Sequence, residues 1–198
     1  LTPALARPLP DGGYELISGH RRLAACQVLD VETMPVIVRE LSDDEAVIAM
    51  VDANLQRETI LPSEKAFAYK MKSEAMKRQG FRTDLTSSQV VTKLRTDDKV
   101  AQGFGVGRMT VQRFIRLTEL IPPILRMVDE GKIALTPAVE LSFLKKDEQE
   151  NLFATMESEE ATPSLSQAQR MKSLSQSGRL DMDTIFAIMT EEKGNQKE

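Results

Sequence analysis

One segment, residues 97–117, constrains this chain most, because its small and apolar residues have the spacing of a helix-turn-helix. The pattern is A-x3-G-x5-V-x2-F, formed by Ala101, Gly105, Val111 and Phe114. A small side chain at Ala101 lets two helices cross closely, and Gly105 can take the left-handed conformation that turns the chain. Val111 and Phe114 would then pack the second helix against the rest of the protein.

The other face of that second helix is polar and basic. It offers donors for phosphates and for base edges in a major groove, on Arg108, Thr110, Gln112, Arg113 and Arg116. We expect the first four to read bases, and Arg116 to contact phosphates together with Lys93 and Lys99. Helical hairpins with a glycine turn also occur in ordinary cores, and the pattern alone leaves that alternative open.

Composition narrows the class of protein. A chain of 198 residues that is 41% apolar and 28% charged can bury a core, and two modest domains are favoured over one. Neither a long apolar run nor a charged-then-apolar leader is present, so we expect a cytoplasmic protein without a membrane span or secretory signal. The single cysteine, Cys26, is interpreted as a small core residue. The lack of tryptophan argues against a sheet that stacks single-stranded bases.

The net charge of −4 conceals an uneven distribution. Basic and acidic residues number 5 and 10 in residues 1–59, 12 and 5 in residues 60–117, and 9 and 15 in residues 118–198. The basic part coincides with the expected helix-turn-helix, as in a local electrostatic footprint for nucleic acid. A solvated helical face would also produce such a block.

Residues 1–59 predict a mixed α and β domain. The runs ALARPL and YELISG, separated by Pro-Asp-Gly-Gly, predict a β-hairpin. A helix over residues 19–29 would begin with Arg21 and Arg22, where free backbone amides and two arginines can hold a phosphate. Salt bridges from these arginines to nearby carboxylates are the equal alternative. MPVIV predicts a short buried strand, and Ser42 begins a capping box for the next helix.

From Pro62 onward the sequence predicts helices alone. Ser63 would cap a bridging helix that ends at Gly80, followed by a polar connection over residues 82–86 and a short helix, SSQVVTKL. Later helices would begin at Pro122-Pro123 and Thr136-Pro137, the first of them ending at Gly131, and further helices would occupy residues 147–157, 164–177 and 181–191. The expected parts are a first domain over 1–59, a bridge over 60–82, an all-α DNA-binding domain over 83–191 and a disordered tail over 192–198.

The order of these segments resembles the ParB family of plasmid and chromosome partition proteins. The resemblance covers roughly residues 1–145, through YELISGHRRLAACQVLDVETMPVIV, ANLQRETILPSEKAFAY, the helix-turn-helix and LIPPILRMVDEGKIALTPAVELSFL. It implies an α+β protein, with a small ParB/sulfiredoxin-like domain before an all-α helix-turn-helix domain. It also implies a homodimer that binds a palindromic site in double-stranded DNA, and a first domain that binds CTP with Mg²⁺ to gate a clamp.

The resemblance places the nucleotide on two motifs. The family's G-E-R-R-x-x-A corresponds to residues 19–25, and its E-N-x-Q-R to residues 53–57. The implied nucleotide-binding residues, with Asn54 also expected to help hold Mg²⁺, are Gly19, His20, Arg21, Arg22, Asn54 and Arg57. His20 replaces an acid and, without a second His or Cys nearby, is interpreted as a hydrogen-bonding surface residue.

Two departures limit what the resemblance implies. Ala53 stands where the family has the glutamate linked to metal binding and hydrolysis, and a methyl group can neither bind Mg²⁺ nor orient water. Asp52 is no simple replacement, because one residue turns a helical side chain by about 100°. The resemblance also begins after the family's first strand, first helix and the segment that meets the partner ATPase, and it leaves no room for the C-terminal dimerisation domain.

The residues and the resemblance leave three candidate functions for this chain. The leading expectation is a sequence-specific DNA-binding protein of plasmid partition or chromosome segregation, gated by CTP. The second is a local transcription regulator with the same fold. The third is an enzyme, either a CTP hydrolase or a phosphoryl-transfer enzyme like sulfiredoxin, whose G-C-H-R motif is Ser18-Gly19-His20-Arg21 here and lacks the cysteine. Because Ala53 replaces the expected glutamate, we expect weak CTP hydrolysis at most.

Overall fold

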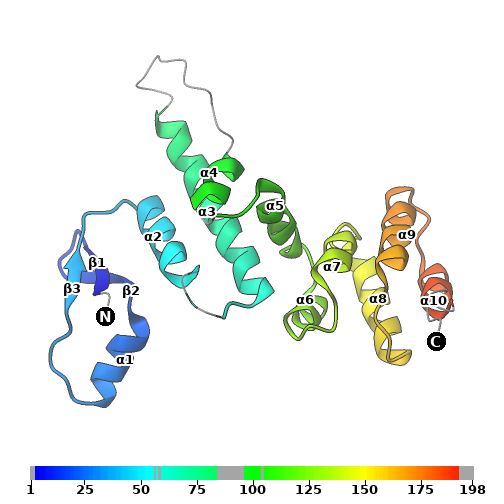
Figure 1. The fold of residues 1–198 in the computed structure, drawn as a ribbon, viewed down its shortest axis with the longest axis horizontal. Coiled ribbons are helices and arrows are strands. Elements are labelled where there is room, and N and C mark those ends of the chain that lie inside the picture. The colour runs from blue at the N-terminus through cyan, green and yellow to red at the C-terminus, as the bar shows by residue number, and fades with distance from the viewer. Residues whose placement is uncertain (1–2, 56, 58, 84–95, 104, 192–198) are drawn as a thin grey trace. The chain divides into compact units, whose positions relative to one another are not determined.

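The computed structural model describes residues 3–55, 57, 59–83, 96–103 and 105–191, with side chains described for these except 80–83 and 96–99. A short three-stranded sheet comes first and the remaining elements are helices (Figure 1), which confirms the α+β class. The chain divides into two compact units, Leu1–Ile60 with Ala68–Arg108, and Leu61–Phe67 with Met109–Glu198.

The sheet of the first unit has the order β2-β1-β3. Strands β1 (Ala4–Pro8) and β2 (Tyr14–Ser18) pair antiparallel, with Pro8 opposite Tyr14, so the predicted hairpin is confirmed. Gly12 and Gly13 turn the chain with φ values of 94° and 85°, a conformation that costs little without a Cβ. Helix α1 (His20–Val28) follows directly, and β3 (Val36–Val38) returns parallel to β1.

Two expectations of burial in this unit are wrong. All three residues of β3 are exposed, because β3 is a short edge strand that, within the described part of the chain, pairs with β1 alone. Helix α1 contains no buried residue, and Cys26 is half-exposed instead of lying in a core. The apolar pattern of these segments therefore predicted their secondary structure correctly and their burial incorrectly.

Helix α2 (Asp43–Leu55) begins as the capping box predicts. The backbone N–H of Ser42 donates to the Glu45 carboxylate at 2.8 Å, and the Glu45 N–H points back to the Ser42 hydroxyl at 3.4 Å. Two ion pairs join α2 to the following long helix: Arg78 with Asp44 at 2.7 Å, and the buried Lys72 with Asp52 at 2.5 Å.

The long helix α3 (Pro62–Thr83) differs from its prediction at both ends. It begins at Pro62, so Ser63 is not its cap: the Ser63 N–H and hydroxyl donate to the Asp129 carboxylate at 2.9 and 2.6 Å. The Glu64 carboxylate accepts from the Leu61 N–H instead. The helix also continues through residues 80–83, where we expected an end and a polar connection.

The helix-turn-helix consists of α4 (Thr96–Gly103) and α5 (Arg108–Leu117). Gly105 turns the chain at a φ of 63°, as predicted, and the Val106 N–H donates to the carbonyl of Ala101 at 3.1 Å. Ala101 and Val111 are buried. The predicted helix SSQVVTKL and the tail over 192–198 lie outside the described residues.

The second unit continues with five short helices. They are α6 (Pro122–Asp129), α7 (Leu135–Leu141), α8 (Lys146–Ser158), α9 (Leu165–Gln176) and α10 (Met182–Thr190). These bounds confirm the predicted helices to within one or two residues. Their apolar faces form one core that also receives α5, through side chains that include Leu117, Ile124, Leu141, Leu152, Met171, Ile185 and Ile188.

One buried polar side chain ties the loops of this core together. Gln149 on α8 is fully buried. Its amide oxygen accepts from the Ile121 N–H at 2.8 Å, and its amide nitrogen donates to the carbonyls of Leu144 and Glu119 at 3.0 and 3.2 Å. Because buried backbone groups need partners, this amide fixes the loops that enter α6 and α8.

Candidate DNA interface and nucleotide site

The second helix of the helix-turn-helix, α5, has one face in the core and one outside it. Val111 and Leu117 are buried and Phe114 packs against the core. At the helical period of 3.6 residues, Gln112, Arg113 and Arg116 lie away from Val111. They share that side with Met109, which is 64% exposed. The helix therefore presents a polar and basic surface from a rigid support.

Arg113 is held by the start of α7. Its guanidinium Nη2 donates to the hydroxyl of Thr136 at 2.5 Å, across 23 residues of sequence. This contact leaves the guanidinium at the surface with its remaining N–H donors, and it restricts the side-chain rotamers. An arginine restrained in this way loses less entropy when it binds a base edge or a phosphate.

Arg116 makes more contacts within the protein than a side chain that serves only to bind a phosphate would make. Its Nε donates to the Ser142 hydroxyl at 3.0 Å, and its Nη2 donates to the Ser142 carbonyl. The guanidinium also lies over the Phe143 ring at 4.1 Å from the centroid, and Lys172 stacks on the same ring at 3.9 Å. Arg116 thus fastens α5 to the end of α7 in addition to any role toward DNA.

The structure gives less detail for the other predicted DNA-binding residues. Arg108, Thr110 and Gln112 lie on α5 and are half-exposed. Lys93 lies outside the described residues, and Lys99 lies in α4 with its side chain not described. Sequence reasoning missed Thr136, because a contact between residues 23 apart leaves no local pattern.

The first nucleotide motif forms the start of α1. Gly19 has a φ of 102°, and a Cβ there would lie 2.7 Å from the Cβ of Ala4 on β1. Only glycine fits this position without displacing the strand. The Arg22 guanidinium lies beside Gly19, while His20 and Arg21 are exposed. The first turn of α1 carries no acidic residue, so the positive end of the helix is not neutralised from within that turn.

The second nucleotide motif lies at the end of α2. Ala53, Asn54 and Arg57 are exposed there, and the Arg57 N–H points to the Asn54 carbonyl at 3.4 Å. The Asp52 carboxylate is paired with Lys72 and so is engaged elsewhere. The structure thus places Gly19 beside Arg22, and Asn54 close to Arg57, on two separate elements.

Two family models match this chain over the parts just described. They are the ParB N-terminal domain, over residues 1–55, and the ParB HTH domain, over residues 86–176. The chain belongs to the ParB family. Helix α5 therefore lies in a ParB HTH domain. The first nucleotide motif lies within the ParB N-terminal domain, and the second begins at its end.

Relatives extend this finding. A probable chromosome 1-partitioning protein ParB of Deinococcus radiodurans is 37% identical over 70% of this chain and 41% of its own length. A nucleoid occlusion protein of Bacillus velezensis is 34% identical over 75% of this chain and 47% of its own. The chain spans less than half the length of these curated relatives.

A solved structure shares the ParB fold. It is a C-terminally truncated ParB from Caulobacter crescentus, complexed to the centromeric parS site, with a TM-score of 0.51 and 23% identity. The likeness covers 89% of this chain and 83% of that one. Among the described residues, no helix is long and apolar enough to cross a membrane.

Proposed function

We propose that this chain is a sequence-specific DNA-binding protein that acts in plasmid or chromosome partition, with α5 as its recognition helix. The observation that carries the proposal is the basic face of α5, supported on one side by the core and restrained through Arg113 and Arg116. Relatives named for chromosome partitioning, and a ParB complexed to parS, support it. A nucleoid- or plasmid-associated location follows from this role.

The proposal divides the residues of the interface into two roles. Base edges would be read by Arg108, Thr110, Gln112 and Arg113, because arginine and glutamine can form paired hydrogen bonds with guanine and adenine. Lys93, Lys99 and Arg116 would contact phosphates, which sets affinity and orientation without reading sequence. A homodimer on a palindromic site would place two α5 helices in successive major grooves.

The first unit would bind CTP. Free backbone amides at the N-terminus of α1 can hold a phosphate, and His20, Arg21 and Arg22 lie in the first turn of that helix. Asn54 and Arg57 would supply the second group of contacts. This nucleotide role is supported by the two motifs.

Mg²⁺ fits these residues only in part. Ala53 has no ligand atom, Asp52 is paired with Lys72, and Asn54 offers one amide oxygen. Among the described residues, no group of three His, Cys, Asp or Glu side chains could hold a metal. Mg²⁺ prefers oxygen ligands and keeps several waters, so the ion would depend mainly on nucleotide phosphates. Asn54 would orient one side of it.

A second candidate is a DNA-binding regulator outside partition, such as a nucleoid occlusion factor or a local transcription regulator. Relatives named as nucleoid occlusion proteins at 31–34% identity favour it. Mapping of bound sites in the cell separates the two. A clustered array of sites indicates partition, whereas one site beside a promoter indicates local regulation.

The experiment that tests the proposal is selection of bound duplexes from a random DNA pool, with and without CTP and Mg²⁺. We expect one palindromic sequence, and nucleotide should change retention on closed DNA circles. Enrichment of no sequence would contradict α5 as a reader. A palindrome whose binding and retention ignore CTP would leave DNA recognition standing and contradict the nucleotide role.

A further inference from the structure

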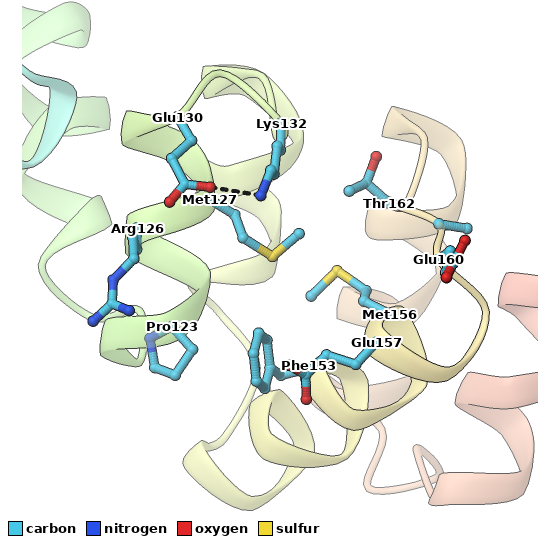
Figure 2. A pocket seen from close by; sticks show the side chains of 11 residues that line it. Pro123, Arg126, Met127, Glu130, Lys132, Phe153, Met156, Glu157, Glu160 and Thr162 are labelled. Atoms are coloured by element: carbon cyan, nitrogen blue, oxygen red, sulfur yellow. Dashed lines mark ion pairs between the residues drawn. The ribbon is translucent and has the colours of Figure 1, made fainter.

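The second unit contains a pocket that the proposed DNA and nucleotide roles do not use. It has a volume of about 550 Å³ and lies between α6, with the turn after it, and the C-terminal half of α8, with the loop after it. Figure 2 shows Met127 of α6 and Met156 of α8 pointing toward one another across it, with Phe153 and Pro123 below them. Methionine and phenylalanine side chains thus form an apolar floor.

The rim of this α6–α8 pocket is charged. On the α6 side, Glu130 and Lys132 form an ion pair at 2.7 Å, which lowers the pKa of Glu130, and Arg126 adds a positive charge there. Glu157 and Glu160 are exposed on the other side. They lie at the C-terminal end of α8, whose last turn has no basic residue, so their charges meet the negative end of the helix. The α8 side of the rim therefore attracts a cation, whereas the α6 side, where Arg126 also lines the pocket, does not.

Glu160 also occupies a backbone conformation that glycine normally takes. Its φ is 49°, directly after the last capping residue of α8, and the Ala161 N–H closes the turn on the Met156 carbonyl at 3.2 Å. Helices α6 and α9 end in the same type of turn with Gly131 or Gly178, and α1 ends in it with Asp30 at a φ of 53°. The pocket rim thus keeps a carboxylate at a position where glycine would be more stable.

We propose that the α6–α8 pocket binds a basic, apolar peptide segment of a partner protein. One large apolar side chain rests on Met127, Phe153 and Met156, and an adjacent lysine or arginine pairs with Glu157 and Glu160. The volume is within the range of binding pockets, and unbranched methionines adapt to side chains of different shape. Charge complementarity selects the basic neighbour.

The test uses a library of random twelve-residue peptides selected on the full chain. We expect sequences that combine a large apolar residue with lysine or arginine. Binding of a selected peptide should shift the methyl NMR signals of Met127 and Met156. Affinity should fall at least tenfold in a variant that combines Glu157→Gln with Glu160→Gly. It should stay unchanged in a matched variant that combines Glu150→Gln with Asp183→Asn, two exposed carboxylates outside the pocket.

The single variant Glu160→Gly separates binding from stability. Removing the strained backbone should raise Tm by about 2–4 °C, while peptide affinity falls. The proposal is overturned if no peptide is enriched, if enriched peptides are neutral or acidic, or if the pocket variant binds them as well as the wild type. It is also overturned if the pocket variant abolishes self-association, which would make a second copy the occupant.

Discussion

At the scale of single residues, two arginines on one helix have different surroundings. Arg113 keeps most of its donors at the surface and is restrained through one hydroxyl, that of Thr136. Arg116 is bonded to the Ser142 hydroxyl and carbonyl and stacked on Phe143. Loss of Arg113 should therefore change DNA recognition, whereas loss of Arg116 should also loosen the domain.

Replacement of Arg113 by alanine should weaken binding to the selected DNA site by about 1–3 kcal/mol and relax preference at one base position. Affinity for random duplex should change much less, because that affinity comes mainly from phosphates. Fluorescence anisotropy with both duplexes measures the difference.

The matched control for this arginine is Arg170→Ala. It removes the same charge from α9, where Arg170 forms an exposed ion pair with Glu191, the residue after α10. Thr136→Val should cost less than Arg113→Ala and should add nothing in an Arg113→Ala background. Full additivity of the two changes would contradict the positioning role of Thr136.

The absent carboxylate at position 53 gives a second prediction at this scale. Ala53→Glu restores an oxygen ligand at the exposed end of α2, so Mg²⁺-dependent release of phosphate from CTP should rise above the wild-type level. Ala53→Gln, which has similar size and no charge, is the control. Equal release from all three proteins would mean that this position does not govern hydrolysis.

At the scale of elements, several helix ends could be predicted from local signals, although the start and the end of α3 could not. Gly105, the Ser42 box and Pro122 each act within four residues, and the structure places them as the sequence indicates. The prediction that Ser63 caps α3 is wrong, because its hydroxyl donates to the carboxylate of Asp129, 66 residues away. The prediction that β3 is buried is wrong, because an apolar run indicates a strand but does not determine which elements pack against it.

The buried hydrogen bonds of Gln149, which connect α8 with the loops before α6 and α8, should contribute strongly to stability. Gln149→Leu keeps similar volume but leaves the Ile121 N–H and the Leu144 carbonyl without their partner, which should cost about 2–3 kcal/mol. Urea unfolding followed by circular dichroism measures the loss. Gln169→Leu, at an exposed position of α9, should change stability little, and an equal loss in both variants would contradict this account.

The start of α2 gives a pH-dependent prediction. Hydrogen bonds from the Ser42 backbone and then its hydroxyl lower the pKa of Glu45 from its ordinary 4.5. The contribution of Glu45 to stability is therefore present above pH 4.5 and is lost as the pH falls through the lowered value. Wild type should have a higher Tm than Glu45→Gln at pH 7, with the difference disappearing in acid. A difference that persists in acid would contradict the ionised cap.

At the scale of the whole molecule, the distribution of charge and the order of the family's segments supported the predicted function more than any single motif did. The chain has a net charge of −4, yet its excess of basic residues is confined to residues 60–117. That segment includes α5, and the family models match on both sides of the α3 bridge. Contacts such as Arg113 with Thr136, and the pocket between α6 and α8, depend on packing of distant segments and could not be read from the sequence.

Equilibrium binding to two duplexes of equal length and composition tests whether this chain recognises a DNA sequence. One duplex carries the palindrome obtained by selection, and the other carries the same bases in shuffled order, at one physiological salt concentration. If α5 reads bases, the palindrome should bind at least about 10³-fold more tightly. Equal affinity for the two duplexes would contradict sequence-specific recognition by this chain.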